Sequence, residues 1–572
     1  MKRNFRFSVL MAAAIAAGLT SGANAATINL TGGITGSLAA AVASAAAGDV
    51  IVIGDSLTYS NAGAITIPVA LTISAGPGFT PTIQNTNATG QVFVPNAALT
   101  VIGDSSTTRI TIQNTASHTG GQPLINSGSP AAATHGISLT NVTLSRLGSG
   151  VNAHLSLNNS ATAYTLTNVN FVGGSGTVAT GIVSLVPAAS STGMTITMSN
   201  VDFSAATTNT NRLNINNNVT VINASNSDLR SGTGLNSAFL NLTASPTGTY
   251  TFDDCTFGAD NSVPFAGLTL ASAANVTLNR PVFNSGIGIR GFQVSAGSLT
   301  INGTSAASKS SLDGLADGST GSVIAFRMFG GTLNLNRVSG TSLRLAGGAG
   351  TLIDSDGNLT SNVALNFTQC DFQNGAGSYR ARVVTGGSFG VTVTGTNTIW
   401  EGLGASGPAN IVFSGDGLGA SSLNLTHCTF FAPSSSNLLF LGNVDLTETV
   451  GSAPGRGDTL TSKYSLYDGT GGVGVSNLDL LDSTGSPNLV QGGSIFGFAG
   501  PSPAGTVFGV GPIDSTGRLT GFGAAAAAAT ASAAVVDVDG GMRPNGGTTP
   551  DIGAFESTAS GSEVRDWELI GE

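Results

Sequence analysis

Charged residues are scarce in this sequence of 572 residues. Only 9% of the residues are Asp, Glu, Lys or Arg, and 30 acidic residues face 20 basic ones. Nucleic acids and anionic membrane surfaces are bound by clusters of Lys and Arg, so we expect no nucleic-acid partner. Disorder is excluded as well, because 41% of the residues are hydrophobic and a disordered chain has few of them.

Tryptophan and tyrosine are also rare, with two Trp and six Tyr in the whole chain. Binding sites for sugars usually expose aromatic rings on which the sugar stacks. Trp400, Tyr164 and Tyr250 fall at apolar positions of the repeat described below, where we expect them to point inward. The shortage of aromatic residues therefore weighs against an enzyme that acts on long glycans.

Long hydrophobic runs are missing, except near the N-terminus. A basic segment from Lys2 to Arg6 precedes an apolar stretch over residues 7–19, and Ala23-Asn24-Ala25 follows. The stretch is shorter than the roughly 20 residues that span a bilayer, and the order is typical of a signal peptide cleaved after Ala25. We therefore expect an exported protein, extracellular or on the cell surface, with no transmembrane span and no lipid anchor. Its mature net charge would be −13 instead of −10.

What the sequence does contain is a six-residue repeat of the type Leu-Thr-Asn-Val-x-Phe. Eleven copies, some of them degenerate, follow one another at a mean spacing of about 29 residues. They start at Leu139, Leu166, Met198, Ala224, Phe252, Leu278, Ile301, Leu335, Phe367, Gly395 and Leu425.

Each position of the repeat has its own character. The first position and the residue two places before it are apolar in nearly every copy, and the residues between are Thr, Ser, Asn or Asp. Such alternation is typical of a strand with one buried face. The third position, often Asn, breaks the alternation, because an inward Val or Cys follows it. Asn tolerates the left-handed conformation better than other residues except Gly, so the unit is predicted to be strand, one-residue turn, strand.

A spacing of about 29 residues fits one coil of a three-stranded parallel β-helix, in which each coil pairs with the next. The alternative is a set of antiparallel β-sandwiches, but sandwiches do not keep one motif in register over eleven copies. We therefore predict an all-β protein, a single right-handed parallel β-helix (solenoid), with a short capping helix near its N-terminus. Ser37 is expected to be the N-cap of that helix, and Gly48 to stop it.

The predicted organisation has five segments. A signal peptide over residues 1–25 precedes an N-terminal cap and first strand over 26–60. The coils then occupy residues 61–450, and C-terminal coils with a cap occupy residues 451–556. A polar, acidic tail over residues 557–572 ends the chain.

The three cysteines follow the same register. Cys255, Cys370 and Cys428 occupy the position that Val holds in other copies, so each is expected to be a small buried side chain. Cys370 and Cys428 would lie two coils apart, or about 10 Å at the strand spacing. A disulfide needs Cα atoms within about 7 Å, so we expect three free thiols and no disulfide-linked partner.

With these features the chain resembles the pectin-lyase-like superfamily of right-handed parallel β-helix proteins, over roughly residues 30–510. The segment DIGAFE at residues 551–556, preceded by Asp537 and Arg543, is similar to the end of bacterial secreted proteins of the choice-of-anchor Q group. This resemblance implies polysaccharide lyases, hydrolases, adhesins and inert stalks alike, because one fold carries many functions.

One constellation of charged residues could support chemistry. Asp202 and Asp228 are expected in one outward column, with Asp254 on the next coil and Arg230 close by. Stacked carboxylates repel one another unless a cation or an Arg neutralises them. These four residues are the candidate catalytic residues of a polysaccharide lyase or glycoside hydrolase, and the three Asp are candidate Ca²⁺ ligands. The competing interpretation, which we favour, is a solvated acidic patch beside the turn.

The sequence thus favours a non-catalytic β-helix that serves as an adhesin, a stalk or an envelope component. Its expected partner is an extracellular glycan or the cell envelope. An extracellular polysaccharide lyase or glycoside hydrolase is the alternative. A module that only binds a glycan is the third possibility.

Overall fold

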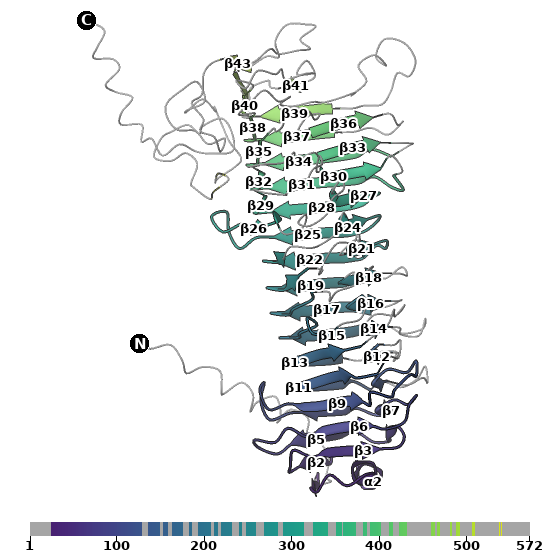
Figure 1. The fold of residues 1–572 in the computed structure, drawn as a ribbon. Helices are drawn as coiled ribbons and strands as arrows, with labels where there is room; N and C mark the ends of the chain where they lie inside the picture. Colours follow the sequence, from purple (N-terminus) through teal and green to yellow (C-terminus); the bar gives the residue numbers. More distant parts are fainter. Residues whose placement is uncertain are drawn as a thin grey trace, which may run out of the picture.

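The computed structural model describes residues 25–127 without a gap. Beyond them it describes the strands and adjoining turns between residues 135 and 508, with gaps between strands, and residues 537 and 539. Most of the predicted signal peptide, the DIGAFE segment and the acidic tail lie outside the described residues. The described strands form one elongated right-handed stack of coils along a single axis (Figure 1). This confirms the predicted parallel β-helix.

The first face of the stack holds the strand that begins each coil. Its strands pair in parallel from one coil to the next. They are β1 (Thr27–Leu30), β2 (Val50–Ile53), β5 (Leu71–Ala75), β8 (Leu99–Ile102), β11 (Ile137–Arg146), β13 (Ala163–Gly173), β15 (Met194–Ser199), β17 (Val219–Ser225), β19 (Thr249–Asp253), β22 (Asn275–Asn279), β25 (Ser298–Asn302), β28 (Gly331–Asn336), β31 (Val363–Thr368), β34 (Val391–Thr396), β37 (Ser422–Thr426), β39 (Thr459–Lys463) and β41 (Leu481–Asp482).

After the first face the chain turns one corner and enters a short face, which we call the third face. The second halves of β11 and β13 belong to it. Its other strands are β3 (Thr58–Asn61), β6 (Thr82–Asn85), β9 (Ile110–Asn114), β20 (Thr256–Phe257), β23 (Val282–Phe283), β26 (Ser310–Ser311), β29 (Val338–Gly340), β32 (Asp371–Phe372), β35 (Ile399–Glu401), β38 (Thr429–Phe431), β40 (Leu466–Asp468), β42 (Asn488–Gln491) and β43 (Thr506–Phe508).

The second face closes the coils that begin with the strands from β2 to β34, and it is a 13-stranded sheet in the described part of the chain. Its strands are β4 (Ile65–Ile67), β7 (Phe93–Pro95), β10 (Ile125–Asn126), β12 (Leu155–Leu157), β14 (Val183–Leu185), β16 (Leu213–Ile215), β18 (Leu240–Leu242), β21 (Leu268–Leu270), β24 (Arg290–Val294), β27 (Ile324–Met328), β30 (Thr351–Asp356), β33 (Ala381–Thr385) and β36 (Ile411–Gly415).

The register of the first face is the one that the repeat predicts. Leu139 is paired with Leu166, Leu166 with Met198, and so on through every copy to Gly395 and Leu425. The first residues of all eleven copies therefore form a single ladder. A parallel sheet keeps such a register because a slip by one residue would turn every apolar side chain outward.

The core is a set of apolar ladders inside the stack. Phe171 and Phe203, at the last position of two copies, stack with ring centroids 4.5 Å apart. Tyr164, Tyr250 and Trp400 are buried, as their positions in the repeat predict. Full burial of one such side chain stabilises the fold by about 1.5–3 kcal/mol. The same contribution recurs coil after coil, so the core extends along the axis and is not gathered at one centre.

The corner between the first and third faces turns at the third position of the repeat. Ten non-glycine residues there have a positive φ of 48–57°. The predicted left-handed turn is thereby confirmed, although only five of the ten are Asn. The positions are Asn141, Asn168, Asn200, Asn226, Asp254, Arg280, Arg337, Gln369, Asn397 and His427.

The N-terminal end of the stack is covered by the short helix α2 (Ser37–Ser44), which buries Leu38, Ala41 and Val42. The predicted capping helix is present, but the predictions of both its ends are wrong. It ends at Ser44 with Ala45 as its C-cap, before Gly48 is reached. Gly36 holds the N-cap position in a left-handed conformation. The Ser37 hydroxyl donates to the carbonyl of Ile34 at 2.6 Å, so its oxygen caps no amide of the first turn.

Candidate functional site

Asp202 and Asp228 lie on the third face and are neighbours in one column. Parallel bridges join Asn170 to Asp202, Asp202 to Asp228, and Asp228 to Thr256. The two carboxylates therefore sit on successive coils, as the repeat predicts. Each one also accepts a bond from the backbone two residues later, at 2.8 Å for Asp202 and 3.1 Å for Asp228. These local bonds fix the two side chains at the beginning of the turn that follows.

Arg230 binds the carboxylate of its own coil. Its Nε lies 2.9 Å from both carboxylate oxygens of Asp228, and its Nη2 donates to Asp228 as well. This hydrogen-bonded pair raises the pKa of Arg230, and the nearby charge of Asp202 adds to the effect. A bidentate guanidinium is a strong partner for a carboxylate. Arg230 therefore remains a cation and neutralises Asp228.

A second guanidinium approaches Asp202 from another coil. Arg109 belongs to the corner segment before β9, and its Nη1 donates to the carbonyl of Asn168. Burial lowers the pKa of Arg109, while attraction by Asp202 acts in the opposite direction. Arg212 is a third cation near the pair, because Asp228 attracts it and its Nε donates to the carbonyl of Arg230 at 2.8 Å. The negative charge of Asp202 and Asp228 is therefore offset by three Arg side chains.

Asp254 occupies a different place. It is the corner residue of its coil, with a φ of 52°, and forms an ion pair with Arg280, the corner residue of the next coil. The two hydrogen bonds are 2.7 Å long and lower the pKa of Asp254. Asp254 is thus paired with another Arg, at a corner and not in the column of Asp202 and Asp228.

The described part of the chain contains no group of three or more His, Cys, Asp or Glu that could hold a metal ion. The Ca²⁺ site remains a prediction, which a binding measurement can test. Chemically, the arrangement offers one adjacent pair of carboxylates beside Arg230. A glycoside hydrolase uses two carboxylates, so the number fits, but Asp228 is already bound by Arg230. A Ca²⁺ site needs six to eight oxygen ligands, more than this pair supplies by itself.

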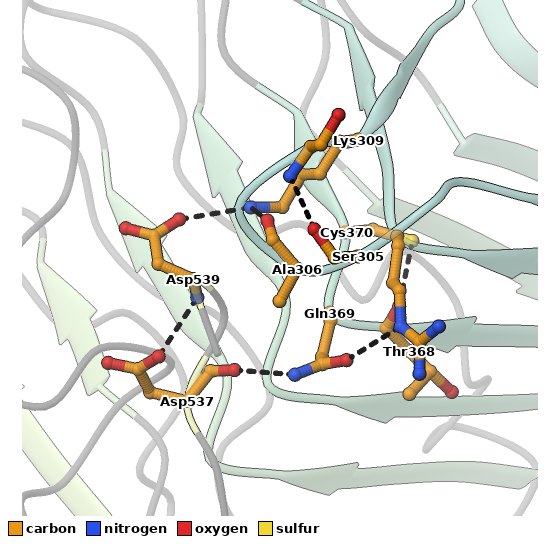
Figure 2. Close-up of polar contacts among 10 residues, drawn as sticks. Ser305, Ala306, Lys309, Thr368, Gln369, Cys370, Asp537 and Asp539 are labelled. Carbon is orange, nitrogen blue, oxygen red and sulfur yellow. Dashed lines mark hydrogen bonds and ion pairs between the residues drawn. The ribbon is translucent and has the colours of Figure 1, made fainter. Parts of the chain in front are cut away.

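A contact that the sequence does not predict joins the C-terminal part of the chain to the middle of the stack (Figure 2). Gln369, a corner residue, donates from Nε2 to the carbonyl of Asp537 at 2.8 Å. Its Oε1 accepts from Nε of Arg337, the preceding corner residue, at 3.3 Å. The corner amide thereby bridges its own ladder to a residue 168 positions later.

The same docking site includes an ion pair. Nζ of Lys309 donates to Asp539 at 3.0 Å and to the carbonyl of Ala306 at 2.6 Å. The Lys309 side chain is only 9% exposed and that of Asp539 is 34% exposed, so water is excluded mainly from the Lys309 side of the pair. Arg337 and Gln369 interrupt the Asn column, but Asp254, Arg280 and His427 do so as well, so the sequence carries no signal specific to this site.

The three cysteines are buried free thiols, as the register predicts. Burial raises the pKa of Cys255 to about 12 and that of Cys370 to about 12. A thiol with such a pKa stays protonated near neutral pH and is a poor nucleophile. Cys255 and Cys370 therefore act as packing groups.

Among the described residues, no helix combines the length and the apolar character that crossing a membrane requires. Comparison of the chain with models of known protein families and with curated proteins yields no match. The fold and the geometry of its polar groups therefore carry the functional argument.

Proposed function

We propose that this chain is a non-catalytic β-helix protein of the cell exterior, which acts as an adhesin, a stalk or another envelope component. The observation that carries the proposal is the pairing of the candidate catalytic carboxylates. Asp228 is bound by Arg230 and Asp254 by Arg280, and the two pairs lie on different parts of the coil. An acid that must give up a proton needs a raised pKa, whereas the pKa of Asp254 is lowered.

The shape of the molecule supports the same proposal. A stack of coils in one register gives a stiff, elongated body (Figure 1), which suits a protein that holds or spaces other parts of an envelope. Export by the predicted signal peptide and the resemblance to secreted β-helix proteins belong to this proposal. So does the five-segment organisation.

The experiment is a depolymerisation assay on a panel of acidic and neutral polysaccharides, with and without millimolar Ca²⁺, using protein expressed without residues 1–25. We expect no release of reducing ends and no unsaturated products. Sustained cleavage of any polysaccharide, lost in Asp228→Asn, would show that the proposal is wrong. The fold of that variant is checked by circular dichroism.

A polysaccharide lyase or glycoside hydrolase is the second candidate, and one observation favours it. Asp202 and Asp228 are adjacent across one coil step, with Arg230 beside them. Titration calorimetry with Ca²⁺ tests this candidate separately from any substrate. Binding that is lost in both Asp202→Asn and Asp228→Asn would support it, and the absence of binding at millimolar Ca²⁺ would remove its metal-dependent form.

A further inference from the structure

The outward side of the first face carries columns of uncharged polar side chains. One column runs in unbroken register from Thr72 on β5 to Asn424 on β37, and it contains only Thr, Ser and Asn. The column beside it runs from Thr140 to Thr426, and its only charged residue is Asp253. Both columns are half-buried or exposed in the described strands. The face is therefore long, polar and nearly free of charge.

Hydrogen bonds between coils hold these side chains in place. In the second column, Asn336 donates to Asn302 at 2.9 Å and Asn302 donates to Asn279 at 2.8 Å. Asn279 in turn donates to the single carboxylate, Asp253, at 2.6 Å. Sheets of many strands stay flat when side-chain ladders of this kind support them. The direction of each amide is thus fixed by its neighbours.

The first column has a ladder of its own. Asn366 donates to Asn334 at 2.8 Å, and Asn334 donates to the hydroxyl of Thr300 at 3.0 Å. Neighbouring groups recur at about 4.8 Å along the axis and at about 6.6 Å across it, because strands and alternate residues are spaced so. The donors and acceptors of this face therefore form a regular two-dimensional array.

An array of this kind orders water. Each hydroxyl or amide can hold a first-shell water at low entropic cost, and the regular spacing places these waters in a repeating plane. Charged groups would orient water around themselves, but the only carboxylate of the two columns already accepts from Asn279. Each Thr also carries a methyl group beside its hydroxyl. The methyl group forms no hydrogen bonds, so water on this face binds the hydroxyl groups and neighbouring waters.

We propose that the first face, from β13 to β37, is an ice-binding surface, whose ligand is the ordered water of an ice crystal plane. The array repeats over distances of the same order as the oxygen spacings in ice. A glycan chain fits the face less well, because Tyr164, Tyr250 and Trp400 are buried in the core, so these rings are not available for sugars to stack on. This inference goes beyond the role of an adhesin or stalk, and neither depends on the other.

The test uses the chain without residues 1–25 and two substitutions in the middle of the face, Thr277→Lys and Thr300→Lys. The matched control is Thr269→Lys, which lies on β21 of the second face and in the coil that precedes the coil of Thr277. All three Thr are half-buried and point outward. Circular dichroism and thermal melting establish that each variant keeps the fold.

Ice recrystallisation and thermal hysteresis are then measured at equal protein concentrations. The unmodified chain and Thr269→Lys are expected to inhibit recrystallisation, and the double variant Thr277→Lys/Thr300→Lys is expected to lose that inhibition. Inactivity of the unmodified chain, or equal loss in Thr269→Lys, overturns the proposal. A third result would also overturn it. If the unmodified chain binds an insoluble neutral polysaccharide, the double variant does not, and neither protein affects ice growth, the face is a glycan site.

Discussion

The two ends of the described stack turn the same corner in different ways. In the coils of β2, β5 and β8, several residues separate the first-face strand from the third-face strand, namely residues 54–57, 76–81 and 103–109. From β11 to β37 one left-handed residue makes the turn in nearly every coil. The exception is the coil of β25, where residues 303–309 form a loop. One geometrical problem thus has two solutions within one chain.

The two solutions are stabilised by different groups. In the N-terminal coils, Asp55 accepts from the amides of Gly32 and Leu57, and Asp104 accepts from the amide of Gly78. In the later coils, Asn168 donates to Asn141 at 2.9 Å, and Asn200 donates to Asn168 at 3.0 Å. The loop corners vary in length and are held by Asp side chains that accept from backbone amides. The one-residue corners have a fixed length, and at the first three of them Asn side chains bind one another from coil to coil.

The largest expected effect is the loss of a one-residue corner. Asn168→Val places a β-branched side chain at a φ of 52° and removes both ladder bonds, so we expect it to destabilise the fold by about 3 kcal/mol. Asn168→Gly keeps the backbone conformation and loses only the ladder bonds, for about 1–2 kcal/mol. Chemical denaturation measures both values.

The control for this comparison lies in a corner loop. Thr80 is exposed within residues 76–81, and Thr80→Val should change stability by less than about 0.5 kcal/mol. Equal effects of Val and Gly at position 168 would contradict the importance of the left-handed conformation. A large effect at Thr80 would contradict the tolerance of loop corners.

The next effect concerns the loop corner in the middle of the stack. Lys309→Met keeps the length of the side chain but leaves Asp539 without its cation, so we expect a loss of about 1–3 kcal/mol. The C-terminal segment should also become more sensitive to limited proteolysis. Arg280→Met removes the cation of an exposed pair with Asp254 and should leave the cleavage pattern unchanged. Identical patterns for both variants would show that the docking of Asp539 is unimportant.

Acid should distinguish the two kinds of corner. Burial alone would raise the pKa of Asp55, but hydrogen bonds from Gly32, Leu57 and Tyr59 outweigh it and lower the pKa below 3.8. Because the folded pKa lies below the unfolded one, this stabilisation is fully present above pH 3.8 and is lost as the pH falls through the folded value. Amide exchange in β3 should therefore rise below that pH, while exchange in β13 changes less. Asp55→Asn should remove the difference.

The smallest expected effect concerns the three cysteines: reductant should leave the protein unchanged, because no disulfide is expected. The native protein should react slowly with a thiol reagent at pH 8, because the thiols of Cys255 and Cys370 are buried and protonated. Denaturation should expose three thiols per chain. Rapid labelling of the native protein, or a dimer that reductant dissociates, would contradict the register of the one-residue coils.

Much of this comparison could be predicted from the sequence. The inward ladder from Leu139 to Leu425 can be recognised in the sequence, because burial requires an apolar residue at the same position of nearly every coil. Arg280, Arg337 and Gln369 take the left-handed conformation as well, although their residue types do not favour it. At these corners the neighbouring coils determine the backbone, and the column position is a better guide than propensity.

The sequence predicts less about the positions of the polar side chains. Asp254 stands in the corner column of the repeat, so its separation from Asp202 and Asp228 could have been found by aligning the copies. The contact between Gln369 and Asp537 joins residues 168 positions apart and belongs to no periodic pattern. A contact made once in the chain leaves no repeated signal, and it appears only when the chain is folded in space.

Because each coil pairs strictly with the next, the number of coils sets the length of the molecule. Every inserted or deleted coil changes its length by one strand spacing of about 4.8 Å, and the coils on either side keep their neighbours. A lineage that gains or loses units of this repeat would thus adjust the reach of the rod in equal steps. The one-residue corner makes this counting possible, because it leaves a new coil only one way to join the stack.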